Sequence, residues 1–167
     1  VEKLNRLTHQ NHQGVITFVS DITFQRIEDL VPFAFEQGRM PLFLILDRVT
    51  DVRNIGSIAR TAECAGVDGL ILPARGSAPI NSDAIKTSAG ALYKLPVVRS
   101  QNLKDTIKFL KDSGLVIAAA TEKAPDDYTR TDLNQPLAII LGSEGEGVSE
   151  EYLKLSDISL RIPVNGE

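Results

Sequence analysis

The chain alternates between short apolar runs and longer stretches of mixed polarity. The apolar runs contain Val, Ile, Leu and Ala with little polar alternation, which is typical of strands covered on both faces of a sheet. We therefore expect seven strands. They are predicted at residues 15–19, 42–47, 69–72, 95–98, 115–120, 137–141 and 158–162.

The stretches between these runs have the spacing of apolar positions that helices show. Helices are predicted near residues 27–37, 54–65, 82–93, 102–112 and 149–155. Repetition of strand and helix predicts an α/β fold, with a mostly parallel sheet flanked by helices. Ligands of such sheets bind beyond the carboxyl ends of the strands. The loops of interest therefore follow Asp47, Ala120, Leu141 and Ile162.

Helix 54–65 has two contrasting faces when its residues are placed at about 100° intervals. One face is apolar and is assigned to the core; it holds Ile55, Ile58, Ala59, Ala62 and Ala65. The opposite face holds Arg53, Gly56, Ser57, Arg60 and Cys64. A solvated helix face explains this pattern as readily as a cationic binding face with a gap at Gly56. Asn54 has the residue type of an N-cap for this helix.

A glycine-rich loop with acidic residues follows the strand at 137–141. Its glycines, Gly142, Gly145 and Gly147, do not match G-x-G-x-x-G, and no G-x-x-x-x-G-K-[ST] motif occurs in the chain. The loop carries Glu144 and Glu146 but no Lys or Arg, which argues against a dinucleotide or nucleoside triphosphate site. It is either a tight turn with solvated glutamates or a site for a ligand that is not a polyanion.

Composition narrows the class of protein. The 167 residues suit one domain, and no apolar run approaches the roughly 20 residues that span a bilayer, so we expect no membrane partner. The net charge of −4 argues against a general polyanion binder but allows a local basic patch. The single cysteine, Cys64, favours a reducing, cytoplasmic location. His9 and His12 have no nearby Cys or carboxylate cluster, so we expect no metal site.

Three segments resemble the motifs of the SpoU/TrmH family of RNA 2'-O-ribose methyltransferases, in the SPOUT superfamily, and its RlmB-like members in particular. The first motif is matched by Asn54-Ile55-Gly56 and Arg60 within residues 44–72, and the second by the run from Leu141 to Gly147. The third begins at Ile162-Pro163 and stops before the Ser-Leu-Asn segment that the family carries next. The resemblance runs from about Pro41 to the end of the chain.

The resemblance implies S-adenosyl-L-methionine as the cofactor, bound in a C-terminal deep trefoil knot. By position, the cofactor pocket is expected to include Thr121, Leu141, Gly142, Ile162 and Pro163. A sulfonium cation without phosphates suits an acidic glycine loop. The resemblance also implies a SPOUT methyltransferase catalytic domain over 21–167, truncated at its C-terminus. Residues 1–20 are expected to be a linker, the end of an N-terminal RNA-binding domain that this sequence lacks.

The motif match assigns catalysis to Arg60, Asn54 and Glu144. Because a guanidinium is a poor base, we expect Arg60 to clamp the phosphate next to the target ribose and to stabilise the developing alkoxide. Asn54 is expected to orient the nucleotide or Arg60, and Glu144 to hold either in place. Three further cations are expected to contact RNA: Arg48, Arg53 and Lys86.

The resemblance also suggests substrate and assembly. Residues 12–15, His-Gln-Gly-Val, resemble the junction after the RNA-binding domain of ribosomal-RNA members, which favours a guanosine of 23S rRNA over tRNA. A homodimer is implied, with helix 54–65 and the segment after Glu144 in a largely apolar interface, where Gly56 and Ser57 permit close approach. A catalytically inactive RNA-binding member of the fold and a nucleotide-dependent α/β enzyme of another class remain as alternatives.

Overall fold

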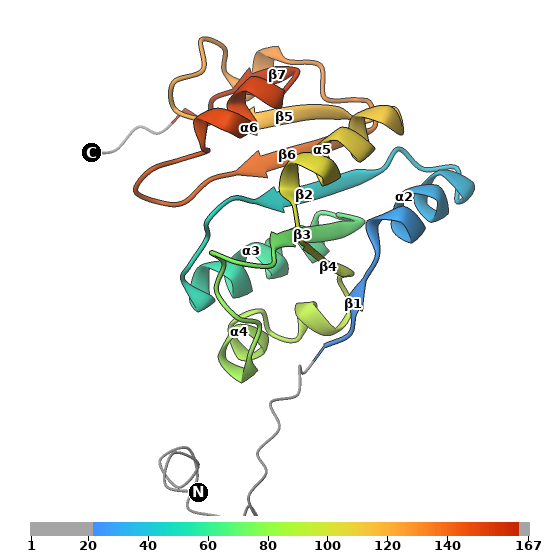
Figure 1. Cartoon of the computed structure of the whole chain (residues 1–167), viewed down its shortest axis with the longest axis vertical. Coiled ribbons are helices and arrows are strands. Elements are labelled where there is room, and N and C mark those ends of the chain that lie inside the picture. Colours follow the sequence, from blue (N-terminus) through green and yellow to red (C-terminus); the bar gives the residue numbers. More distant parts are fainter. Residues whose placement is uncertain (1–21, 164–167) are drawn as a thin grey trace, which may run out of the picture.

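The chain folds around a parallel sheet in the computed structural model, which describes residues 22–163 (Figure 1). The seven strands run in the order β1-β4-β3-β2-β6-β5-β7, and every pairing is parallel. This confirms the predicted α/β class. The strands are β1 (Phe24–Gln25), β2 (Leu42–Leu46), β3 (Gly69–Pro73), β4 (Val97–Ser100), β5 (Val116–Ala120), β6 (Leu137–Leu141) and β7 (Ile158–Leu160).

Helices connect most of these strands and cover both faces of the sheet. They are α2 (Ile27–Glu36), α3 (Val52–Cys64), α4 (Ser82–Thr87), α5 (Leu103–Asp112) and α6 (Glu150–Leu155), with 3-10 turns η1 (Ala91–Tyr93) and η2 (Tyr128–Arg130). The predicted strand at 15–19 lies outside the described residues. The prediction for 95–98 is displaced from β4, because Pro96 has no N–H for the sheet and pairing begins at Val97.

The predicted helix at 82–93 is wrong as a continuous element. It ends at Thr87, and η1 follows after a break. Ala89 has a φ of 50° and Gly90 a φ of 85°, both in the left-handed region that ends helices.

Helix α3 corrects three predictions. Its N-cap is Asp51, whose carboxylate accepts from the Arg53 amide at 2.6 Å, so Asn54 lies inside the helix and is not the cap. Ala65, predicted in the core, is exposed. Gly56, predicted on the open face, is buried against α4, and a Cβ there would lie 2.7 Å from Thr87 Cβ. The gap at Gly56 is therefore filled by the chain itself.

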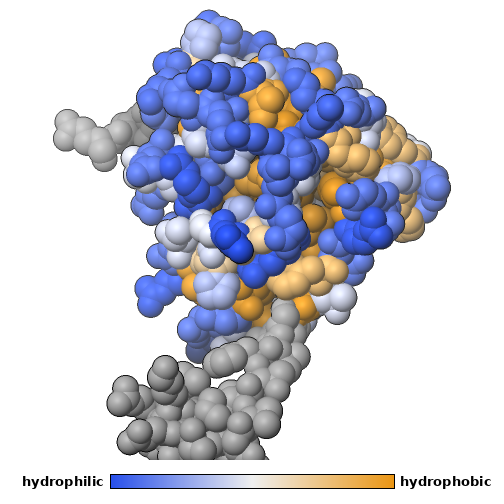
Figure 2. Space-filling view, viewed as in Figure 1, coloured by the Kyte–Doolittle hydropathy of each residue, from blue (hydrophilic) through white to orange (hydrophobic). Residues whose placement is uncertain are grey.

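The core lies on both sides of the sheet because side chains alternate along each strand. Phe43 and Ile45 of β2 point toward α2, α5 and α6, and Figure 2 shows this side with a mostly hydrophilic surface over α5 and α6. Leu46 points to the other side, where it packs with Ile55 of α3. Each central strand thus contributes apolar side chains to a hydrophobic layer on either side of the sheet.

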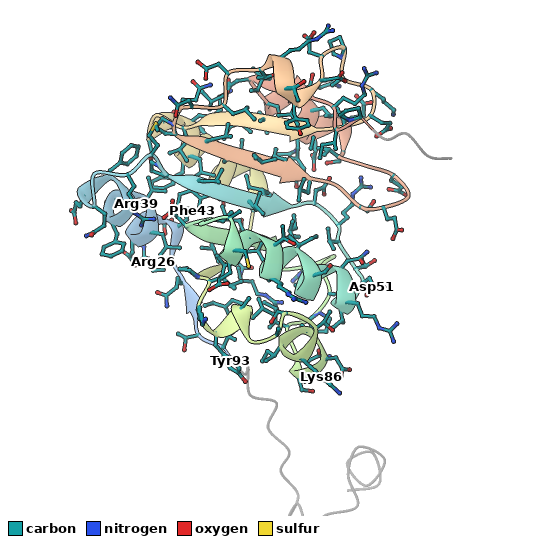
Figure 3. The ribbon with its side chains drawn as sticks, turned by 180° about the vertical axis from the view of Figure 1, so that it is seen from behind. Arg26, Arg39, Phe43, Asp51, Lys86 and Tyr93 are labelled. Carbon is teal, nitrogen blue, oxygen red and sulfur yellow. The ribbon has the colours of Figure 1, made fainter. Side chains whose placement is uncertain are left out.

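The second side of the sheet is only partly covered. Helices α3 and α4 cover β2, β3 and β4, but no α-helix among residues 22–163 covers β6, β5 and β7 on this side (Figure 3). Here Tyr128 of η2 and Leu133 line the edge of the open face. Two grooves of about 350 Å³ each result, and Leu44, Ile139 and Leu141 line both. The surface left open is apolar, which is unusual for a face of a sheet in contact with water.

The C-terminal trefoil knot stays a prediction, which residues 22–163 do not test. No helix among residues 22–163 is long and apolar enough to cross a bilayer. In the same range no group of three His, Cys, Asp or Glu residues could hold a metal ion, and His9 and His12 precede this range.

Candidate functional site

The carboxyl ends of four adjacent strands meet at one edge of the sheet. Leu141 at the end of β6 pairs with Leu46 of β2 on one side and with Ala120 of β5 on the other. Ala120 in turn pairs with Leu160 of β7. Three loops that are far apart in sequence, after β5, β6 and β7, therefore start side by side, as the sequence predicts for a ligand site in a parallel sheet.

The glycine loop after β6 turns back on itself, so that its end crosses its beginning. The Gly147 amide donates to the Ser143 carbonyl at 2.9 Å, and Gly147 has a φ of 67°. A Cβ on Gly142 would lie 1.9 Å from the carbonyl carbon of Gly147. Gly145 differs, because a Cβ there would meet nothing within 4 Å. The glycine at 142 is thus required by a backbone crossing.

Asp47 and Arg48, just after β2, hold this loop in place. The buried Asp47 carboxylate accepts from the Ser149 amide at 2.7 Å. Arg48 forms an ion pair with Glu146 and donates from Nη2 to the Gly147 carbonyl at 3.2 Å. Glu146 therefore has a structural partner, and Arg48, predicted to contact RNA, is engaged inside the protein.

Removal of the Asp47 carboxylate is expected to loosen the loop. Asp47→Ala leaves the half-buried Ser149 amide without its acceptor, and we expect a loss of about 2 kcal/mol in the free energy of unfolding. Asp112→Ala is the matched control, because Asp112 is exposed at the end of α5 and its side chain has no hydrogen bond or ion pair within residues 22–163. Urea unfolding measures both, and equal stabilities would contradict this role of Asp47.

A pocket of about 330 Å³ lies between the ends of β5, β6 and β7. Four of the five predicted cofactor residues line it: Thr121, Leu141, Gly142 and Ile162. Pro163 follows Ile162 but is not part of the lining. The lining includes Glu122 and Glu144 and contains no Lys or Arg, so the pocket suits a neutral or positively charged ligand better than a polyanion. Glu122 was missed, although it directly follows Thr121 at the end of β5.

A second pocket, of about 390 Å³, adjoins the first across the glycine loop. Glu144 and Gly145 line both pockets, and Asn54 and Arg48 line only the second. Asn54 Nδ2 donates to Glu144 Oε2 at 3.4 Å, which joins α3 to the loop. Two of the three predicted catalytic residues therefore lie together at the wall between the pockets.

The third predicted catalytic residue, Arg60, lies elsewhere. It is exposed on α3 and lines neither pocket. Its side chain has no hydrogen bond or ion pair in the part of the chain that the structure describes. Arg53 and Lys86 line a further pocket between α3 and α4. A single chain thus does not bring Arg60 to Asn54 and Glu144.

Tyr152 of α6 interacts electrostatically with Asp47 and Arg48, the residues that hold the glycine loop. Burial, aided by the Glu151 and Asp47 carboxylates, raises the pKa of Tyr152 to about 12. The hydroxyl therefore keeps its proton at neutral pH and does not act as a general base.

Comparison with known proteins identifies relatives of this chain. Residues 41–167 match the model of the SpoU rRNA methylase family. An uncharacterized tRNA/rRNA methyltransferase of Synechocystis is 38% identical over 99% of this chain and 43% of its own length. The "Putative TrmH family tRNA/rRNA methyltransferase YacO" of Bacillus subtilis is 34% identical over 99% of this chain and 67% of its own length.

Solved structures of methyltransferases also superpose on this chain. The SpoU methyltransferase AviRb of Streptomyces viridochromogenes, in complex with AdoMet, superposes with a TM-score of 0.71 at 28% identity, over 77% of this chain and 50% of that one. The AdoMet-bound rRNA methyltransferase of Sinorhizobium meliloti gives 0.70 at 29% identity, over 76% and 49%. The chain thus spans about half the length of these two proteins. It belongs to the SpoU rRNA methylase family.

Proposed function

We propose that this chain is the catalytic part of an RNA methyltransferase that transfers a methyl group from S-adenosyl-L-methionine to a ribose 2'-hydroxyl. The observation that carries the proposal is the pair of adjoining pockets. One is lined by four of the five predicted cofactor residues, and the other by Asn54, with Glu144 in the wall that they share. A donor and an acceptor in these pockets would meet across the glycine loop.

The chemistry of the first pocket fits the cofactor. S-adenosyl-L-methionine supplies an electrophilic methyl group on a positively charged sulfur. Glu122 and Glu144 provide negative charge in the lining, and the crossing at Gly142 holds the loop backbone at the pocket wall. ATP or NAD would bring phosphates to this acidic surface, so the alternative of a nucleotide-dependent enzyme is disfavoured.

The second pocket would hold the ribose. Its 2'-hydroxyl must be held at attack distance and lose its proton as it reacts. Asn54 and Glu144, in contact at 3.4 Å, are placed to orient this nucleotide. Arg60 would clamp the adjacent phosphate and stabilise negative charge as the oxygen attacks.

A guanosine of 23S rRNA is the substrate that we favour, with tRNA as the alternative. The support is the resemblance of residues 12–15 to ribosomal-RNA members, and these residues lie outside the described part of the chain. A tRNA-modifying TrmH/SpoU enzyme of A. aeolicus has a TM-score of 0.68 at 25% identity, which keeps tRNA open. A cytoplasmic location remains a prediction.

Methyl transfer from labelled S-adenosyl-L-methionine tests the proposal. The full-length protein is incubated separately with 23S rRNA and with tRNA, and 2'-O-methyl positions are mapped. Methylation of one RNA supports the function and identifies the substrate class. Cofactor binding in calorimetry without methylation of either RNA would instead indicate an inactive RNA-binding member, and absence of cofactor binding would refute the proposal.

We expect the active unit to be a homodimer. Arg60 lies away from the pockets of its own chain, and the open apolar grooves beside α3 and over β6 offer surface for a second copy. Because α4 covers Gly56, the interface is not expected at Gly56 itself. We expect it on the exposed side of α3, which holds Ser57 and Arg60. Sedimentation equilibrium should give twice the 18.2 kDa of one chain. A monomer at micromolar concentration would contradict the expectation.

A further inference from the structure

A third and larger pocket lies between α3 and α4. Its volume is about 880 Å³, within the range of ligand sites. The start of α3 contributes Asp51 and Arg53 to the lining, and α4 contributes Asp83 and Lys86. Figure 3 shows Asp51 and Lys86 at the same edge of the molecule.

The two cations in this pocket have no hydrogen-bond or ion-pair partner among the residues that the structure describes. Arg53 and Lys86 are exposed, and neither side chain forms a hydrogen bond or an ion pair among residues 22–163. Arg48 is different, since it is bound to the glycine loop. Both charged groups are therefore available to a ligand.

Close contact between the helices fixes the spacing of these cations. Gly56 lies one turn after Arg53, and a Cβ on it would lie 2.8 Å from the Ala84 carbonyl and 2.7 Å from Thr87 Cβ. Lys86 is next to Thr87 in α4. Because the backbones touch at Gly56, Arg53 and Lys86 are held on opposite sides of one groove.

The groove continues into the pocket proposed for the target ribose. Thr50 and Asp51 line both pockets. A nucleic acid strand with one ribose beside Asn54 can therefore pass over the start of α3 into the groove. The Asp51 carboxylate accepts from the Arg53 amide at 2.6 Å, which ties it to the start of α3, and it keeps its negative charge in this passage.

We infer that the α3–α4 pocket binds the nucleotide adjacent to the methylation target, with Arg53 and Lys86 on its backbone phosphates. The inference rests on the proposed function and names the path of the RNA. Asp83 carries negative charge in the same pocket. An isolated anion is therefore attracted weakly. A nucleotide that is tethered to a bound neighbour is already held near the pocket, so it gains the contacts with Arg53 and Lys86 without a separate entropic cost. Phosphate contacts of this kind fix the register of the strand.

The test compares two double variants with the same change in net charge. Arg53→Gln/Lys86→Gln removes both cations from the pocket. Lys108→Gln/Lys154→Gln removes two exposed cations from α5 and α6, which also form no ion pair in the described chain. Affinity for the RNA that the protein methylates is measured against salt concentration, and cofactor affinity is measured by calorimetry.

The logarithm of the RNA association constant falls linearly with the logarithm of the salt concentration. In Arg53→Gln/Lys86→Gln, the loss of two phosphate contacts to single-stranded RNA is expected to make this slope less steep by about 1.4. The Lys108/Lys154 variant should keep a slope close to that of the unsubstituted protein, and both should bind the cofactor normally. Equal slopes for the two variants would overturn the subsite while leaving the proposed function intact. Failure of the unsubstituted protein to bind or methylate RNA would instead defeat the proposed function.

Guanosine monophosphate serves as a second probe. We expect no binding that depends on Arg53 and Lys86, because the pocket gains its affinity from the attached strand. Binding of the free nucleotide that is lost in Arg53→Gln/Lys86→Gln would overturn the inference in favour of a separate small-molecule site.

Discussion

Gly142→Ala is expected to prevent the glycine loop from forming. The added Cβ would lie 1.9 Å from the Gly147 carbonyl carbon and 2.1 Å from the Val148 nitrogen. These are backbone atoms that no rotamer change can move. We expect a loss of about 3 kcal/mol or more in the free energy of unfolding, together with loss of cofactor binding, because the same backbone forms the pocket wall.

Gly145→Ala is the matched control for stability. It places the same methyl group in the same loop, where it meets nothing within 4 Å. Thermal unfolding should show a large decrease for the first variant and a small change for the second. Similar melting temperatures for the two variants would mean that the crossing at Gly142 does not constrain the loop.

Substitution of Arg60 is expected to have the largest effect on activity. Arg60→Ala removes the proposed clamp and should lower the rate of methyl transfer by roughly 100- to 1000-fold. Stability and cofactor affinity should change little, because Arg60 is exposed and lines neither pocket. Arg60→Lys keeps the charge but loses bidentate geometry. Near-full activity of the lysine variant would contradict the clamp.

A mixing experiment tests whether Arg60 acts in the site of its own chain or in the site of the partner chain. If Arg60 completes the site of the partner, Arg60→Ala and Glu144→Gln chains should complement one another. Random pairing of the two variants makes about half of the dimers mixed. Each mixed dimer holds one intact site of its two, so about a quarter of full activity is expected. Activity no greater than the sum of the separate variants would show that Arg60 acts within its own chain.

Sequence patterns predicted the parallel sheet well. Buried parallel strands have a strong signal, and the 137–141 prediction coincides with β6. Motif position supplied the five residues predicted to bind the cofactor, and four of them line one pocket because their strands are neighbours in the sheet. Adjacency of β6 with both β2 and β5 was not visible in the sequence, since it depends on long-range pairing.

The errors arose where one element meets another. Helical spacing placed Gly56 opposite the core, but α4 packs on that face and buries it. Arg48 was predicted only as an RNA contact, and its pairing with Glu146, in a loop nearly a hundred residues later, was not foreseen. Asp47 was noted only as the end of a strand, and its role depends on Ser149, which is equally remote. Local spacing cannot reveal these contacts.

The central position of β6 has a consequence for synthesis of the chain. β2 pairs with β6 along its whole length, from Leu42 with Leu137 to Leu46 with Leu141. At a synthesis rate of about 5–20 residues per second, roughly 5 to 20 s pass between the appearance of β2 and that of its partner. During this interval one edge of β2 has unpaired amides and carbonyls beside apolar side chains. A nascent chain at this stage is exposed to strand-to-strand association with other chains, and it should depend on chaperones until β6 is inserted.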